Sequence, residues 1–144
     1  MIVSELSGAE KWLYSTLSGD ATMQGLIGNP ARVYSGLAPE GSAFPYIVLR
    51  FLAGPDTVAV GGVRIMTNPV YLVMGIDKSS SFATLASINA QIETLIGNQT
   101  GATSDTTILS CVREQPYERA DSDSAGNVYR YLGGRYRLQV QPLN

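Results

Sequence analysis

The side chains in this sequence that could do chemistry are one cysteine and several carboxylates near the C-terminus. Glu114 and Glu118 would have to act as general acid and base if the chain were a glycoside hydrolase. Asp121 and Asp123 alternate like the ligands of a calcium loop, but the glutamate that closes such a loop is missing. We therefore predict no metal site, and a small carboxylate-dependent hydrolase stays open as an alternative.

Histidine is absent from the sequence, which excludes His-containing triads and zinc sites with His ligands. The single cysteine, Cys111, lies in the apolar run 108–112, where no neighbour would lower its thiol pKa, so we expect a buried structural thiol. Neither a phosphate loop nor a dinucleotide fingerprint occurs. The sequence thus predicts no catalytic residue and no cofactor.

The composition favours one domain, because 144 residues with 44% hydrophobic content suit a single packed core over residues 1–144. A net charge of -2 with only 10 basic residues argues against a protein that grips DNA through its phosphates. The first six residues lack the basic and apolar regions typical of a signal peptide, and no apolar run approaches the ~18 residues of a membrane span. We expect a chain made in the cytoplasm without a membrane partner.

The elements that would position an interaction surface are clearest in the last strand, residues 128–141. Its apolar side chains alternate with polar ones, and successive side chains of a strand point to opposite faces. The apolar set is Tyr136, Leu138 and Val140, and the polar set is Arg135, Arg137, Gln139 and Gln141. We therefore expect a sheet that is buried on one face and wet and cationic on the other. Gly133 and Gly134 indicate a bend or bulge in this strand.

Helical spacing of apolar residues predicts three helices. They are residues 7–18 with a Ser7–Glu10 capping box, a short helix capped by Asp20 and ended by Gly28, and a helix after Ser79–Ser81 with an apolar stripe from Phe82 to Ile96. Long strands are predicted at 45–52, 70–77, 107–115 and 128–141. This order favours an α+β, two-layer domain, in which a four-stranded, mostly antiparallel sheet carries helices packed on one face.

Two connections between the predicted strands could contact a partner. Residues 53–69 form a protruding hairpin arm that is too apolar for free coil, and it is either a self-packed ribbon or a partner contact. Residues 116–127 are acidic and rich in small residues, which indicates a solvated loop or a contact arm. The interface candidates are Val58, Val60, Ile65 and Met66 of the arm, with Arg135 and Arg137 of the last strand.

Taken together, the pieces resemble one family over nearly the whole chain. They are Arg32-Val-Tyr34 before a loop with Pro39, Pro45-Tyr-Ile-Val48 at a strand start, a strand ending at Asp77 before an amphipathic helix, and the pairs Tyr129-Arg130 and Arg135-Tyr136. In this order and spacing they resemble the tail-completion, or tail-terminator, proteins of long-tailed bacteriophages.

The resemblance implies a structural virion protein that forms a homo-oligomeric, hexameric ring at the head-proximal end of the tail tube. Such a ring stops tube growth and joins the tail to the head connector, and DNA passes through it without specific binding. The implied partners are the tail tube protein and a connector or stopper protein. The alternatives are a connector, stopper or tube subunit of the same machinery, or a small non-catalytic binding module.

Overall fold

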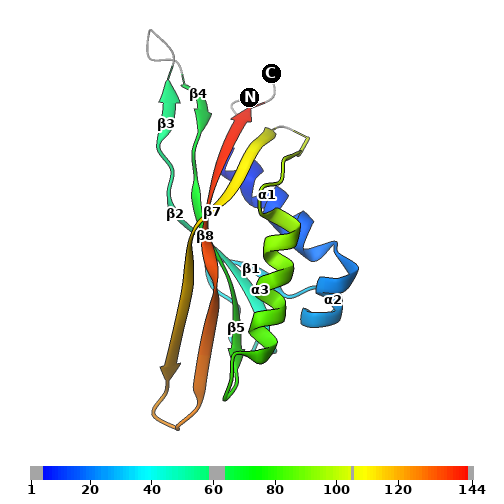
Figure 1. Cartoon of the computed structure of the whole chain (residues 1–144), viewed down its shortest axis with the longest axis vertical. Coiled ribbons are helices and arrows are strands. Elements are labelled where there is room, and N and C mark those ends of the chain that lie inside the picture. The colour runs from blue at the N-terminus through cyan, green and yellow to red at the C-terminus, as the bar shows by residue number, and fades with distance from the viewer. Residues whose placement is uncertain (1–4, 59–63, 105, 143–144) are drawn as a thin grey trace.

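The computed structural model describes residues 5–58, 64–104 and 106–142. Three helices and eight strands follow one another along this part of the chain (Figure 1). In order they are α1 (Glu5–Ser18), α2 (Ala21–Ile27), β1 (Val33–Ser35), β2 (Tyr46–Ala53), β3 (Asp56–Val58), β4 (Arg64–Thr67), β5 (Val70–Lys78), α3 (Ala83–Ile96), β6 (Gly101–Ala102), β7 (Thr106–Ser122) and β8 (Val128–Pro142).

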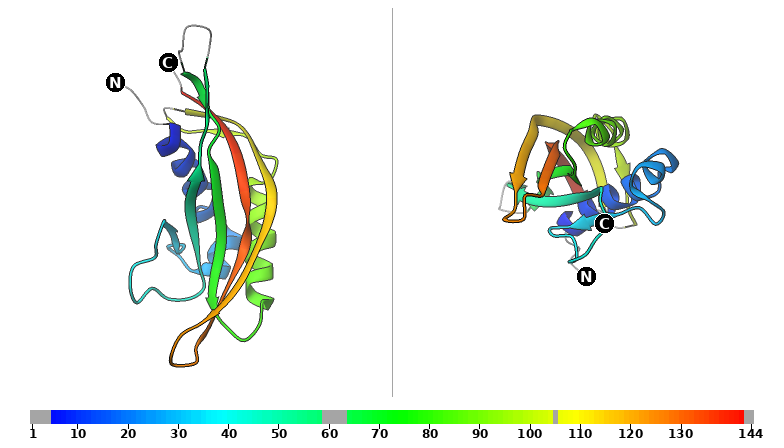
Figure 2. Two further views of the ribbon diagram at one scale, coloured as in Figure 1. Left: turned by 90° about the vertical axis from the view of Figure 1, so that its left-hand side faces the viewer. Right: turned by 90° about the horizontal axis from the view of Figure 1, so that it is seen from below.

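All eight strands join one mixed sheet, in which only β1 and β2 are parallel. β8 is the centre of this sheet, because it pairs with β7 along one edge and with β5 and β4 along the other. The sheet curls into a half-barrel (Figure 2). The predicted four-stranded, two-layer α+β domain is therefore wrong. The short strands β1, β3, β4 and β6 have only two to four residues each, which is too few to show an alternation, and they form by pairing with other strands.

β7 and β8 form a long hairpin, whose turn lies at the end of the molecule opposite β3 and β4 (Figure 1). The sequence predicted a loop over 116–127, but the structure continues β7 through Ser122, which pairs with Val128. Only 123–127 is left for the turn. Two bulges interrupt the ladder, one between Ile108 and Ser110 and one between Arg113 and Gln115.

Part of the predicted arm 53–69 is a ribbon in which β3 pairs antiparallel with β4. Thr67 at the end of β4 also pairs with Val140 of β8, so the ribbon is anchored to the centre of the sheet. Residues 59–63, between the two strands, lie outside the described residues.

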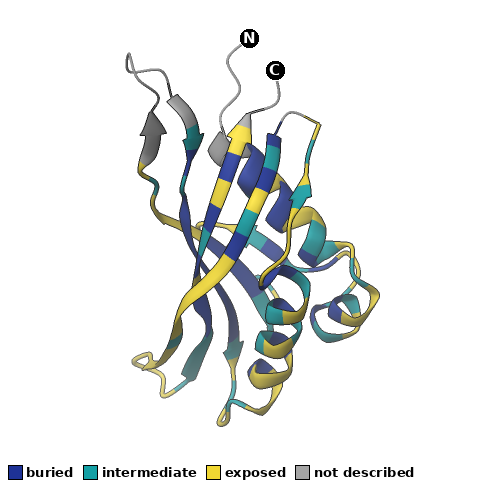
Figure 3. Cartoon of the chain, turned by 45° about the horizontal axis from the view of Figure 1, so that its top comes forward, coloured by how far each residue is buried: buried dark blue, intermediate teal, exposed yellow. Residues whose placement is uncertain are grey.

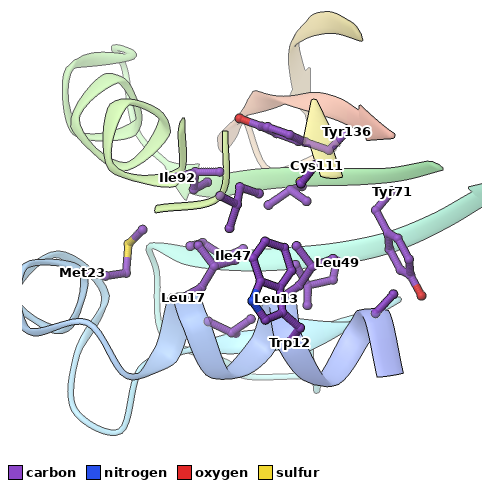
Figure 4. Close-up of a cluster of buried hydrophobic side chains, with 14 of the residues drawn as sticks. Trp12, Leu13, Leu17, Met23, Ile47, Leu49, Tyr71, Ile92, Cys111 and Tyr136 are labelled. Carbon is purple, nitrogen blue, oxygen red and sulfur yellow. The ribbon is translucent and has the colours of Figure 1, made fainter. Parts of the chain in front are cut away.

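The main core lies between the three helices and one face of the sheet (Figure 4). Trp12, Leu13 and Leu17 of α1 are nearly or fully buried, and they pack with strand residues such as Ile47 and Leu49. α3 buries Leu85, Ile88, Ile92 and Ile96, which is the stripe that the sequence predicted. β8 adds Tyr136, Leu138 and Val140, all fully buried, so the predicted alternation of the last strand is confirmed. We refer to this side of the sheet as the helix-covered face.

The helix ends follow their caps in part. The Asp20 carboxylate accepts a hydrogen bond from the Met23 backbone N–H at 2.8 Å, and Gly28 ends α2 with a φ of 97°. α1 already includes Glu5, so Ser7 lies inside the helix and is not its N-cap. No helix in the described ranges is both long and apolar enough to cross a bilayer.

Candidate interaction surface

The face of the sheet that the helices do not cover is hollowed, and we refer to it as the open face. A small cluster of buried residues, Val48, Leu72, Met74 and Ile76, forms its floor. Two adjoining hollows of about 280 and 440 Å³ lie above this floor, and they share Arg50 and Tyr117 in their walls. The open face therefore offers a continuous groove across β2, β5, β8 and β7.

Strand register explains which side chains meet in the groove. Arg50 of β2 pairs with Leu72, Leu72 with Arg135, and Arg135 with Gln115 of β7. Directly paired residues of neighbouring strands share one face, so this row points into the groove. A second row runs through Tyr46, Ile76, Tyr131 and Arg119. Both rows carry arginine at the rim.

The three groove arginines differ in their partners. Arg135 donates to the Gln115 side-chain oxygen at 3.2 Å, and it has no ion pair with any carboxylate that the structure describes. Arg119 forms an ion pair with Asp121 at 2.9 Å, but both side chains are about half exposed. Arg50 is exposed and has no ion pair within the described ranges. Because exposed ion pairs are weak, the groove keeps a net positive field.

Aromatic side chains gather at the end of the groove where the second row lies. Phe44 stacks on Tyr46 with ring centroids 5.2 Å apart, and the Arg119 guanidinium lies 5.7 Å from the centre of the Tyr131 ring. Burial, and then the neighbouring tyrosines, raise the pKa of Tyr46. This phenol therefore stays neutral at physiological pH, so it does not offset the arginine charge.

The structure places five of the six predicted interface residues, and these five lie in two separate regions. Val58 lies in β3, Ile65 and Met66 lie in β4, and Val60 falls outside the described residues. Arg135 and Arg137 lie on the open face of β8, where Arg137 forms an ion pair with Glu114 at 2.9 Å. Sequence reasoning missed Arg50, Tyr117, Arg119 and Tyr131, which only the register of distant strands brings beside Arg135.

The carboxylates considered for catalysis do not converge. Glu114 pairs with Arg137 on the open face, whereas Glu118 pairs in register with Leu132, whose side chain packs against the main core. The two glutamates therefore lie on opposite faces of the sheet and form no acid–base dyad. Within the described ranges, no group of His, Cys, Asp and Glu could hold a metal ion. Cys111 is fully buried, and burial raises its pKa to about 12, as expected for a structural thiol.

Asp123 instead organises the β7–β8 turn. Its carboxylate accepts hydrogen bonds from the backbone N–H groups of Ala125 and Asn127, from the Asn127 amide and from the Tyr129 hydroxyl, at 2.9 to 3.1 Å. These bonds, above all those from Asn127, lower the pKa of Asp123 to about 2. Gly126 completes the turn with a φ of 82°.

Because the folded pKa of Asp123 is depressed, its contribution to turn stability is fully present above the unfolded pKa near 3.8. That contribution is lost as the pH falls through about 2. We expect the Ala125 and Asn127 amide NMR signals to titrate with a midpoint near 2 in the wild type. The variant D123A should abolish this transition. A midpoint near 3.8 would contradict the hydrogen-bonded turn.

Comparisons with known proteins agree with this architecture. A family model described as "Tail completion protein gp17" matches residues 11–132. No curated protein sequence matches the chain. Among solved structures, a chain from the "Virion of native gene transfer agent (GTA) particle" is similar, with 17% identity and a TM-score of 0.74 over 97% of this chain and 99% of that one. At this identity the likeness shows a shared fold alone. The family match covers most of the sequence and confirms the resemblance, so the chain belongs to the tail completion protein gp17 family and is a structural protein of the bacteriophage tail, located in the virion.

Proposed function

We propose that this protein forms a ring at the head-proximal end of a tail tube, where it ends tube growth and joins the tail to the head connector. The observation that carries the proposal is the match to the tail completion family over residues 11–132. The virion origin of the structurally similar chain supports assembly with other tail or head components. The partners proposed are further copies of this chain, the tube protein and a connector or stopper protein.

The surface of the chain suits a ring in two respects. A closed ring needs two different complementary surfaces on each subunit, because its contacts are head-to-tail. The chain offers a groove on the open face and, facing the opposite way, the exposed reverse side of β7 in the β7–β8 hairpin. Figure 3 shows how exposed this hairpin is. Its net charge of -2 also suits a conduit through which DNA passes without being held.

Native mass spectrometry and negative-stain images of the purified protein test the proposal. We expect short rings, with six copies as the expected number, which bind to the end of purified tail tubes. Long tubes formed by this protein alone would instead indicate a tube subunit. Monomers at every concentration, with no ring in the presence of tubes, would contradict the proposal and leave a small binding module.

Reversing the charge of Arg135 and Arg137 tests whether the open face of β8 takes part in assembly. Both side chains are at least partly exposed, and exposed ion pairs contribute about 0–1 kcal/mol, so the double variant R135E/R137E should keep its fold. Assembly should weaken because the charges across the contact become repulsive. The measurements are thermal melting by circular dichroism and ring formation by native mass spectrometry. Normal assembly would show that this face stays exposed to solvent and makes no contact between subunits.

A further inference from the structure

The groove on the open face has an unbalanced charge. The residues that line its two hollows include Arg50, Arg119 and Arg135, and no carboxylate among the described residues lines either hollow. Of these three arginines, Arg119 alone has an anionic partner among the described residues, which is Asp121. A partner that fits this groove should therefore bring a carboxylate to the end where Arg50 and Arg135 lie.

The same chain carries a carboxylate on the opposite side of the β7–β8 hairpin. Tyr117 and Arg119 point into the groove, and Glu118 between them points to the other side, because side chains alternate along a strand. Glu118 is exposed and has no ion pair within the described ranges. Ala120 and Ser122 follow it on the same side of β7 and are also exposed, and β8 places Leu132 and Arg130 opposite Glu118 and Ala120 on this side.

We infer that the groove of one copy receives the reverse side of β7 from a second copy, with Glu118 placed between Arg50 and Arg135. This inference rests on the proposed ring. The groove and the reverse side of β7 lie on opposite sides of one sheet, so each copy donates a carboxylate on one side and accepts one on the other. Such a head-to-tail contact closes into a ring when the rotation from one copy to the next divides a full turn, and otherwise it gives an open filament.

The occupant is a protein surface of this kind because the arginines lie at separate points of a mixed aromatic and apolar groove. Arg50 and Arg135 share one row of the register, and Arg119 lies in another. A duplex would need a basic stripe, whereas one glutamate in a small-residue strand satisfies the Arg50–Arg135 pair. Duplex binding by the groove is therefore an outcome that the test must separate.

A charge-swap series on the full chain tests the contact. The single variants are R50E and E118R, the swapped variant R50E/E118R carries both changes, and K78E is a control at another exposed cation. Ring formation is followed against protein concentration by native mass spectrometry and light scattering. We expect each single variant to need about 10-fold or more higher concentration for ring formation, since like charges then meet across the contact. R50E/E118R should recover most of that loss, and K78E should resemble the wild type.

The outcomes distinguish this inference from the proposed ring. Wild-type rings that are unaffected by R50E, or a swapped variant that fails to recover, would overturn the contact and leave the ring standing. Rings of normal stability combined with loss of duplex DNA retention in R50E would assign the groove to nucleic acid, which also overturns the contact. Failure of the wild type to form rings, alone or with tail tubes, would overturn the ring and with it the contact.

Discussion

Replacing Gly133 with alanine is expected to destabilise the monomer by about 3 kcal/mol, at the upper end of what overpacking costs. A Cβ at this position would lie 2.1 Å from the Val73 carbonyl oxygen and 2.5 Å from the Met74 Cα. These are backbone atoms of the neighbouring strand, so β5 and β8 would have to separate where the sheet curls. The loss should appear as a lower midpoint of urea unfolding.

Gly134 supplies a matched control for this substitution. A Cβ there would first meet the Cδ of Arg113, at 2.7 Å, and Arg113 is an exposed, flexible side chain that can move aside. Neither glycine has a φ in the left-handed region, so the two substitutions differ in available space rather than in backbone strain. We expect G134A to be much closer to the wild type. Equal midpoints for the two variants would contradict the close approach of β5 and β8.

Truncating Trp12 to alanine is expected to cost about 3–5 kcal/mol, the usual range for a buried Trp. Trp12 is 7% exposed and packs within the main core, and its indole lies so close to Gly101 that a Cβ there would be 2.2 Å from Nε1. The indole thereby fixes α1 against β6. Because Trp12 is the only tryptophan, unfolding of the variant should be followed by far-ultraviolet circular dichroism.

Tyr14 provides the control on the same helix, because it is 48% exposed. Y14A should change the free energy of unfolding by no more than about 0.5 kcal/mol, as is usual for surface positions. All variants should be compared at concentrations where each is monomeric, since assembly adds stability by mass action. Similar losses for W12A and Y14A would mean that α1 is not docked as described.

Sequence periodicity predicted the parts of the fold that alternate locally. The apolar stripe of α3 and the apolar side chains of β8 are buried as expected. Both could be predicted because their hydrophobic pattern repeats several times within one continuous segment. The second half of β7 could not be predicted in this way. Most of its residues from Arg113 to Ser122 are exposed, so no hydrophobic pattern marks them, and pairing with β8 alone makes them a strand.

The interaction surface was predictable only in part for the same reason. Arg135 was found because it alternates with buried residues in β8. Arg50 follows three consecutive buried residues of β2, so no regular alternation marks the face on which it lies. Arg119 lies in a mostly exposed segment that has no hydrophobic pattern. Their meeting depends on registers between β2, β5, β8 and β7 that no single segment contains. The local pattern thus identifies Arg135, whereas Arg50 and Arg119 can be assigned to the groove only once the strand order and register are known.

The outer edge of β7 has a consequence for how the chain avoids aggregation. β6 covers this edge only at Thr107 and Ile108, so no described strand pairs with it from Val112 to Ser122. A long open edge is a template for uncontrolled strand addition. Pro116 lies in the middle of it, between Glu114 and Glu118, and proline and charged side chains are the features by which natural sheets discourage such addition. Pro116 and the two glutamates thereby oppose amyloid-like strand addition along this edge.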